Sequence, residues 1–504
     1  MMLTLMVLCV SCEENDSGTT DSPATSPAFD PSKPVVITDF MPKEGAAFQK
    51  MIIYGDNFGN DPSIVKVTIG EKEAVVVSVQ NNSIYCIVPR HVNAGGKTIT
   101  VSVKNKGTEK TGSVEGGFDY QMLKMLAGTL TGYRNENDNQ GWKDGPFEEA
   151  AGFREKGCLA FDPENPHHLY VVYDGGGGGI RLLDLKERVV SFPITTARFP
   201  TDRLRSIDFT LDHDYMVISV DRDNDGAGKT QSVFLLKRND GGTFTEDGGG
   251  GPQLVASYMQ CNGAAIHPVN GEMYFNSYER GQVFRMDLDD YFNHEGEWNP
   301  RLDGGHYEEL FTIQDTRWEF KIHIHPSGDY AYINVINQHY ILRSDYNKDT
   351  KKFVKPYRIA GQIGQNQWVD GVGVSARLME PYQGVFVKNP EYEAEGKADI
   401  YDFYFTDKKS HSIRILTPEG IVKTYAGRGS SGQVSDGNYW GADDGDLREV
   451  ARFRDPTGIA YDETNNIFYI LSTDGRTIRF ISEGGVTGEP EEEPEEEPGE
   501  ESNE

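Results

Sequence analysis

A phrase built around tryptophan, aspartate and glycine occurs three times in this chain of 504 residues. The copies are Trp142-Lys143-Asp144-Gly145, Trp368-Val369-Asp370-Gly371, and Trp440 followed by Asp444-Gly445. Each copy lies in a glycine-rich stretch after a short segment containing Ala-Gly. A phrase that returns at this scale indicates that one supersecondary unit is reused. The sequence therefore predicts a repeat architecture with the three indole rings at equivalent places on one face.

The segments between the glycines are short and alternate apolar with polar residues, which is typical of half-buried strands. Between about residues 121 and 485 we recognise six copies of a strand–turn–strand–turn–strand unit. Their first strands centre near Leu159, Ile207, Ala265, Ile324, Val385 and Ile459. A four-stranded unit repeated at this spacing is typical of a propeller blade. We therefore expect an all-β chain with a six-bladed β-propeller over residues 121–485.

The two ends of the repeat region suggest how such a ring closes. The sixth unit ends after three strands, at Ile481, and an apolar segment over residues 120–127 precedes the first unit. If this segment is the outer strand of the last blade, it closes the ring and removes an exposed strand edge. We expect that pairing.

Residues 34–120 show short alternating strands separated by Gly and Asn turns, a pattern typical of a β-sandwich. Two landmarks are Gly55-Asp56-Asn57-Phe58-Gly59 and the strand Ile84-Tyr85-Cys86-Ile87-Val88-Pro89. With these motifs the segment closely resembles the IPT/TIG immunoglobulin-like family from end to end. The resemblance implies a spacer domain, with ligand binding by this unit as the alternative.

The fifth repeat unit resembles NHL repeats, through Ala376-Arg377-Leu378, His411-Ser412-Ile413-Arg414 and Tyr425-Ala426-Gly427. The whole chain thus resembles the IPT/TIG-plus-NHL lipoproteins of Bacteroidetes, a family associated with polysaccharide utilisation. The resemblance implies a non-catalytic surface protein that binds a polysaccharide, with an outer-membrane transporter complex as a further partner. A propeller lyase or hydrolase and a protein-interaction scaffold are the alternatives.

The first twelve residues resemble a bacterial lipoprotein signal whose Cys12 is lipidated after cleavage. Glu13, Glu14 and Asp16 follow, a cluster similar to a surface-export signal. We expect a lipid-anchored outer-membrane protein exposed at the cell surface; a cleaved, secreted form is the alternative. Residues 13–33 are predicted to form a flexible tether, and the Glu- and Pro-rich residues 486–504 a disordered tail.

The net charge of −30 argues against nucleic acid and anionic membrane surfaces as partners. Membrane contact is therefore expected only through the lipid. Outside the signal the cysteines are Cys86, Cys158 and Cys261, and their number and spacing fit neither zinc nor a disulfide framework. We expect buried free thiols.

In a propeller, the loop from an outer strand to the next inner strand opens on one face near the central pore. Trp142, Trp368 and Trp440 fall in such loops, and Trp318 precedes the fourth inner strand. An exposed indole can stack on the apolar face of a sugar ring. We predict that these four tryptophans bind the glycan; the alternative is that they wedge between blades.

Polar residues on the same rim are expected to join the ligand site: Tyr382, Arg203, Arg377 and Arg454. Arginine forks suit carboxylates, so an acidic glycan is one candidate ligand. The alternative is that these arginines pair with neighbouring aspartates between blades.

Asp221, Asp223 and Asp225, followed by Gly226, match the first half of a calcium loop, but Ser232 stands where the loop needs Glu. An acidic β-turn is the alternative to a calcium site, and no other cofactor is expected. His323 and His325 share a strand face, yet no arrangement specific enough to propose catalytic residues occurs in the sequence.

Overall fold

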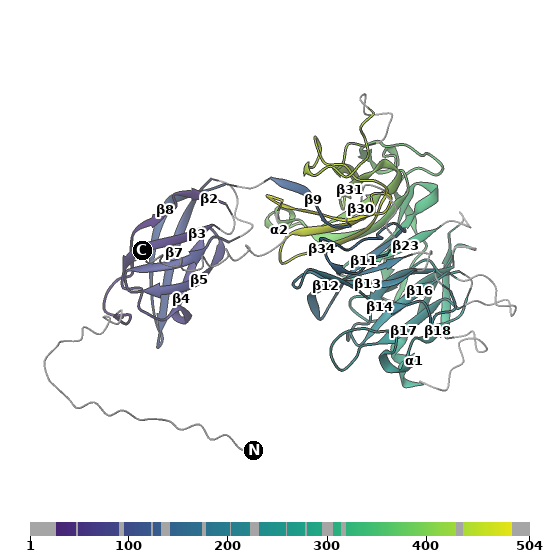
Figure 1. Ribbon diagram of the computed structural model, residues 1–504, viewed down its shortest axis with the longest axis horizontal. Coiled ribbons are helices and arrows are strands. Elements are labelled where there is room, and N and C mark those ends of the chain that lie inside the picture. Colours follow the sequence, from purple (N-terminus) through teal and green to yellow (C-terminus); the bar gives the residue numbers. More distant parts are fainter. Residues whose placement is uncertain are drawn as a thin grey trace, which may run out of the picture. The chain divides into compact units, whose positions relative to one another are not determined.

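The computed structural model describes residues 27–485 except 47–48, 90–94, 122–123, 133–141, 174–177, 202, 222–230, 259, 278–279, 295–305, 314–318 and 430–436 (Figure 1). The predicted signal with Cys12, most of the predicted tether and the predicted acidic tail lie outside these residues. The described chain divides into two compact units, one before and one after the boundary between Leu123 and Lys124. Among its helices, none has the length and apolarity needed to cross a membrane.

The first unit is an all-β domain whose strands follow the order β1-β3-β6-β5-β4-β7-β8-β2. The strands are β1 (Val36–Met41), β2 (Glu44–Gly45), β3 (Lys50–Asp56), β4 (Val65–Ile69), β5 (Lys72–Gln80), β6 (Ser83–Ile87), β7 (Gly95–Asn105) and β8 (Thr108–Tyr120), with a 3-10 turn at Pro62–Ile64. Strand β5 pairs with β4 up to Ala74 and with β6 from Val75 onward. Alternate side chains of the strands, such as Met51 and Ile53, fill one buried core.

The second unit contains six sheets of four main strands, which are the blades of a propeller. Blade one consists of β11 (Gly157–Asp162), β12 (Asn165–Tyr173), β13 (Gly179–Asp184) and β14 (Val189–Thr195). Blade two consists of β15 (Leu204–Phe209), β16 (Tyr215–Val220), β17 (Val233–Lys237) and β18 (Gln253–Ala256). Blade three consists of β19 (Ala264–Ile266), β20 (Met273–Ser277), β21 (Gln282–Met286) and β22 (Tyr307–Thr312). The first strand of each blade is the innermost.

Blade four consists of β23 (Phe320–Ile324), β24 (Tyr330–Val335), β25 (Tyr340–Asn347) and β27 (Tyr357–Gly361). Blade five consists of β29 (Pro381–Lys388), β30 (Tyr401–Asp407), β31 (Ser412–Leu416) and β32 (Ile421–Ala426). Blade six consists of β34 (Pro456–Asp462), β35 (Ile467–Ser472), β36 (Thr477–Glu483) and β9 (Met125–Thr131). The short strand β26 (Lys352–Phe353) extends the hairpin of β25. Short helices, α1 (Leu288–Asn293) and α2 (Pro390–Ala394), and 3-10 turns at 248–250, 336–338, 373–375 and 408–410 lie in the connections.

The inner strands β11, β15, β19, β23, β29 and β34 contact one another in that cyclic order around the axis. All six predicted strand centres lie in them, so the all-β fold with a six-bladed propeller is confirmed. Six separate hydrophobic clusters lie between consecutive blades; between blades one and two, for example, Val172 and Ile180 pack against Ile218. Because each blade buries both of its faces, strands in the middle of a blade, such as β16 and β35, are buried at almost every position.

Ring closure takes place in blade six. Strand β9 pairs antiparallel with β36 from Met125↔Glu483 to Thr131↔Ile478, so residues from both ends of the propeller segment form one sheet. The predicted closure is confirmed, although the strand begins at Met125 rather than Tyr120. Tyr120 instead belongs to β8 of the first unit.

Each Trp-Asp-Gly phrase adds a short fifth strand to the outer edge of a blade. These strands are β10 (Gly145–Pro146) against β14, β28 (Gly371–Val372) against β32, and β33 (Gly445–Asp446) against β9. The phrases therefore lie on the outer rim of three adjacent blades, namely one, five and six. The predicted convergence around a central mouth is wrong for Trp142 and Trp368, because the connecting loop runs along the outer edge of the next blade before it turns inward. Trp440 instead contacts Arg454, which lies two residues before the inner strand β34.

Candidate functional site

The aspartate of each repeated phrase pairs with a fully buried arginine on the third strand of the same blade. Asp144 lies 2.7 Å from Arg181, Asp370 2.8 Å from Arg414, and Asp444 2.6 Å from Arg479. None of the three guanidinium groups is exposed, whereas each aspartate is about half exposed. A buried guanidinium needs both a counter-charge and hydrogen-bond acceptors, and the repeated phrase supplies them.

The same arginines also clamp the loop that contains the phrase. In blade one, Arg181 donates to the carbonyls of Lys143 and Ala151 at 2.7 and 2.8 Å. In blade six, Arg479 donates in the same way to Asp443 and Arg452 at 2.9 and 2.6 Å. The equivalent acceptors of Arg414 in blade five are the carbonyls of Val369 and Arg377. The repeat is therefore a structural device that ties a loop to its blade.

Trp142 is half-buried and packs within blade one. Its ring lies 4.7 Å from Tyr173 and 5.5 Å from Phe192, and the Arg181 guanidinium lies 5.2 Å above it. Its indole nitrogen is buried and has no hydrogen-bond partner among the described residues. These contacts are those of a packing residue, the alternative to the predicted glycan contact.

Trp368 is also half-buried. Its indole nitrogen donates to the hydroxyl of Thr424 at 3.0 Å, and the backbone of Gly429 lies directly against the ring, where a Cβ would approach to 2.7 Å. The polar end of this indole is thus already bonded within the blade.

Trp440 differs from both, because it is 41% exposed. The guanidinium of Arg454 lies 4.3 Å from the centre of its ring, and Tyr439 lies edge-on at 6.4 Å. Arg454 in turn forms an ion pair with Asp474 at 3.3 Å. Trp440, Tyr439 and Arg454 together form the surface that we call the Trp440 platform.

The other predicted ligand residues have partners inside the protein. Arg377 donates to the carbonyls of Val374 and Ala376 at 2.6 and 2.9 Å. Tyr382 is 1% exposed, so a glycan on the surface cannot reach it. Trp318 lies outside the described residues.

Two arginines lie against Asp221, the first residue of the predicted calcium loop. The carboxylate of Asp221 is buried, pairs with Arg205, and lies 3.2 Å from Arg203. Two guanidinium groups at one carboxylate repel a cation, so Asp221 is not a calcium ligand in this arrangement. Asp223 and Asp225 lie outside the described residues, and elsewhere no group of His, Cys, Asp and Glu side chains that the structure describes is arranged to hold a metal.

Charged residues gather where the inner strands begin. Glu319, which precedes β23, pairs with Lys156 at 2.5 Å and Arg205 at 3.0 Å, and so links blades one, two and four. Burial alone would raise the pKa of Glu319, but the charges of Arg205, Lys156 and Lys321 outweigh it and lower the pKa to about 2. Glu319 is therefore ionised at neutral pH.

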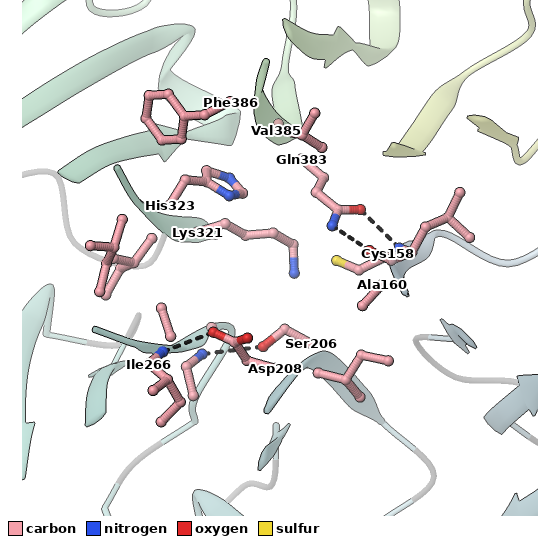
Figure 2. Close-up of a pocket in the computed structure, with 18 of the residues that line it drawn as sticks. Cys158, Ala160, Ser206, Asp208, Ile266, Lys321, His323, Gln383, Val385 and Phe386 are labelled. Carbon is pink, nitrogen blue, oxygen red and sulfur yellow. Dashed lines mark hydrogen bonds between the residues drawn. The ribbon is translucent and has the colours of Figure 1, made fainter. Parts of the chain in front are cut away.

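Below this cluster the propeller axis contains a cavity of about 410 Å³, lined by five of the six inner strands (Figure 2). Lys321 closes it at the level where the strands begin: its ammonium group reaches across the space and donates to the carbonyls of Arg205 at 2.8 Å and Asn262 at 3.1 Å. Three blades meet at this one side chain.

Polar side chains in the cavity bond to the inner strands of neighbouring blades. The Gln383 amide accepts from the N–H groups of Leu159 and Ile459 and donates to the Leu159 carbonyl. Asp208 accepts from the Ile266 N–H at 2.8 Å, and Ser206 accepts from the Ala264 N–H at 3.2 Å (Figure 2). Inner-strand edges have no further strand to pair with, so these side chains satisfy backbone groups that would otherwise be orphaned.

Two titratable groups in the cavity are held in unusual states. Burial raises the pKa of Asp208 to about 6, despite hydrogen bonds from the backbone N–H groups of Ile266 and Phe209. Burial, and then the positive charge of Lys321, lower the pKa of His323 to about 3. His323 is therefore neutral at physiological pH.

The expectation for the cysteines is confirmed: Cys86, Cys158 and Cys261 are buried and form no disulfide bond. The cavity itself was missed from the sequence. Its one available signal is the pair Lys321 and His323, which alternate along a strand that is otherwise apolar and so must both point to the same side of it. The sequence predicts that this strand is innermost in its blade, but it does not show that the inner strands leave a space between them.

Comparisons with known proteins agree with this architecture. The family model of the IPT/TIG domain matches residues 34–120. A crystal structure from Bacteroides thetaiotaomicron, named as a candidate phosphatase, is 49% identical over 90% of this chain and 98% of its own, with a TM-score of 0.68. No curated protein matches the chain.

Two further solved structures are auxiliary nutrient binding proteins. The one from B. thetaiotaomicron is 43% identical over 90% of this chain and 99% of its own, with a TM-score of 0.61. The one from Bacteroides ovatus is 35% identical over the same shares, with a TM-score of 0.64.

The fold and these matches define a protein class in which an IPT/TIG immunoglobulin-like domain is joined to a β-propeller. The chain belongs to the family of these Bacteroides proteins, as its motifs predicted.

Proposed function

We propose that this protein is a non-catalytic nutrient-binding protein that captures a polysaccharide at the cell surface. Two relatives that match nearly end to end are named auxiliary nutrient binding proteins. The observation on which the proposal rests is the exposed Trp440 platform. A pyranose has an apolar C–H face that stacks on an indole, and its hydroxyls can bond to a guanidinium beside the ring.

The platform is held in place before any ligand arrives. Asp444, in the same loop, pairs with the buried Arg479, and the Arg452 guanidinium donates to the carbonyl of Asn438 at 2.8 Å. Binding to a fixed surface costs less conformational entropy than binding to a mobile one. This supports Trp440 as a docking point.

The charges around the platform favour a neutral glycan over an acidic one. Arg454 in the platform is paired with Asp474, and Arg203, a predicted ligand residue of blade two, is paired with Asp221. The net charge of −30 would also repel an acidic polymer as it approaches the protein.

The proposal includes a lipid anchor at Cys12 and a position on the outer membrane, with the tether of residues 13–33 between lipid and protein. An outer-membrane transporter complex is the proposed recipient of the captured glycan. Weak binding at each platform would suffice, because many copies on one membrane add avidity.

The test is retention of the purified protein in native gels that contain one polysaccharide each, with Trp440→Ala as the variant and Trp368→Phe as the matched control. At least one neutral polysaccharide should retard the wild type and the control but not Trp440→Ala. Equal retardation of all three proteins, or of none, would contradict the proposal. Release of reducing ends from that polysaccharide, or of phosphate from a generic phosphate ester, would contradict its non-catalytic part.

A further inference from the structure

The axial cavity contains hydrogen-bonding groups that the protein leaves unused. Lys321 has three N–H donors, and two of them are bonded to carbonyls. The Nε2 atom of His323 is buried and has no partner among the described residues. Each carboxylate oxygen of Asp208 accepts one backbone N–H, which leaves further lone pairs on both.

We infer that this cavity is a second binding site, which takes one small neutral polyhydroxylated molecule, of one or two sugar rings, between Lys321, His323 and Asp208. The inference rests on the proposed function in one respect: it is the reason for choosing carbohydrates among the polyhydroxylated molecules that would fit.

The pattern of donors and acceptors selects this ligand class. His323 is neutral, and it donates one ring N–H to the backbone of Tyr382, which makes the unpartnered Nε2 an acceptor. Asp208 is an acceptor as well when it is ionised, and Lys321 is a donor. A hydroxyl group both donates and accepts, so adjacent hydroxyls can serve all three. The ionised oxygens of a carboxylate or phosphate ligand have no proton to give to His323 or Asp208, and the carboxylate of Asp208 would repel such an anion.

The dimensions fit one or two sugar rings. Lys321 and Ile324, which both line the cavity, are three residues apart on β23, which corresponds to about 10 Å along the strand. The volume of about 410 Å³ lies at the lower end of the range for small-molecule sites, roughly 300 to 1,000 Å³.

Part of the remaining wall is apolar and contains an aromatic ring. Phe386 lines the cavity (Figure 2). Its ring is stacked on Tyr332 at 5.5 Å, and His325 lies edge-on to it at 4.9 Å. Such a ring can receive the C–H face of a pyranose, as an indole does. Ile207 and Val385 also belong to this lining.

This site is separate from the Trp440 platform. None of Tyr439, Trp440 and Arg454 lines the cavity, and the inner strand β34, which Arg454 precedes, contributes no residue to its lining. A polymer on the platform and a small sugar in the cavity could therefore be bound independently.

The test is isothermal titration of the purified chain with free glucose, galactose, mannose, xylose and N-acetylglucosamine, and with glucuronate and inorganic phosphate as anionic probes. At least one neutral sugar should bind with one-to-one stoichiometry. The variant His323→Leu, which lacks the acceptor, should weaken that binding at least tenfold. His323→Gln, which restores an acceptor, should weaken it less, and Trp440→Ala should leave it unchanged.

Saturation-transfer NMR on the wild type gives the same test without a substitution, should His323→Leu fail to fold. No saturable binding of any neutral sugar in both experiments, tighter binding of an anionic probe, or unchanged binding by folded His323→Leu would overturn the inference. Polysaccharide retention separates the two proposals, because it depends on Trp440 and should be normal in His323→Leu.

Discussion

The carboxylate of Asp444 lies 2.6 Å from the guanidinium of Arg479, which is completely buried on the third strand of its blade. The same pair recurs as Asp144 with Arg181 and as Asp370 with Arg414. A sequence phrase that first suggests three ligand-binding tryptophans is therefore explained by three arginine–aspartate pairs that fix loops to blades.

Removing one of these aspartates should destabilise the propeller. In Asp444→Ala the Arg479 guanidinium loses its counter-charge while it stays buried, and we expect a loss of roughly 2 kcal/mol, less than for a fully buried pair because Asp444 is half exposed. Urea denaturation measures the change. The neighbouring Asp443→Ala is the control, since Arg479 bonds to the main-chain carbonyl of Asp443; equal losses in the two variants would refute the account of the repeat.

The three rim tryptophans should separate into two kinds. Trp142→Ala removes ring contacts with Tyr173 and Phe192 and should lower Tm by several degrees. Trp440→Ala removes an exposed ring and should shift Tm by about 1 °C or less. Scanning calorimetry of both variants measures these shifts in Tm. If Trp142→Ala melted like the wild type but no longer bound glycan, the packing role would be rejected.

Glu319 should contribute stability that depends on pH. Its pKa in the folded protein, about 2, lies below the ordinary glutamate value of 4.5, so the folded state favours the ionised form. The contribution, at most roughly 3 kcal/mol, is complete above about pH 5 and is lost as the pH falls from there toward 2.

Glu319→Gln should thus be less stable than the wild type at pH 7, with the gap narrowing as the pH falls. Urea midpoints measured from pH 7 to pH 3 test this. A gap that stays constant with pH would show that the ion pairs with Lys156 and Arg205 do not stabilise the fold.

Closure by β9 should depend on Gly128. A Cβ at this residue would lie 2.3 Å from the ring of Phe480 on the paired strand β36, whereas a Cβ at Gly241 would meet open space. Gly128→Ala should therefore speed hydrogen exchange in β36 while β20 of blade three stays protected, and Gly241→Ala should change neither. Uniform loss of protection around the ring would show that blade six is not the local point of closure.

Much of this fold could be predicted because inner strands are short apolar runs at a regular spacing. The strands around Ile207 and Val385 were placed correctly on that basis. The closing strand could be inferred as well. The sixth unit lacked a fourth strand, and the segment that forms β9 preceded the first unit without belonging to any unit.

The candidate site could be predicted only in part. Periodicity shows that a phrase repeats, but it does not show on which edge of the sheet the phrase lies, so Trp142 and Trp368 were assigned to a mouth that they do not line. One clue was available: Ile-Arg occurs in the third strand of each blade with the phrase, at Ile180-Arg181, Ile413-Arg414 and Ile478-Arg479. A buried arginine requires a carboxylate, which the phrase provides.

The calcium prediction was wrong for Asp221 for a similar reason. Spacing identified Asp221 as an oxygen donor but did not reveal that Arg205 and Arg203, from the neighbouring inner strand and its entry, lie against it. Contacts of this kind depend on how strands are aligned across a sheet, which the local sequence does not specify.

A crystal structure of the protein with an oligosaccharide cut from a polysaccharide that it retains would test the central claim most directly. The account predicts a sugar ring stacked on the indole of Trp440, with a hydroxyl bonded to Arg454. An oligosaccharide bound to the first unit, with Trp440 unoccupied, would contradict it.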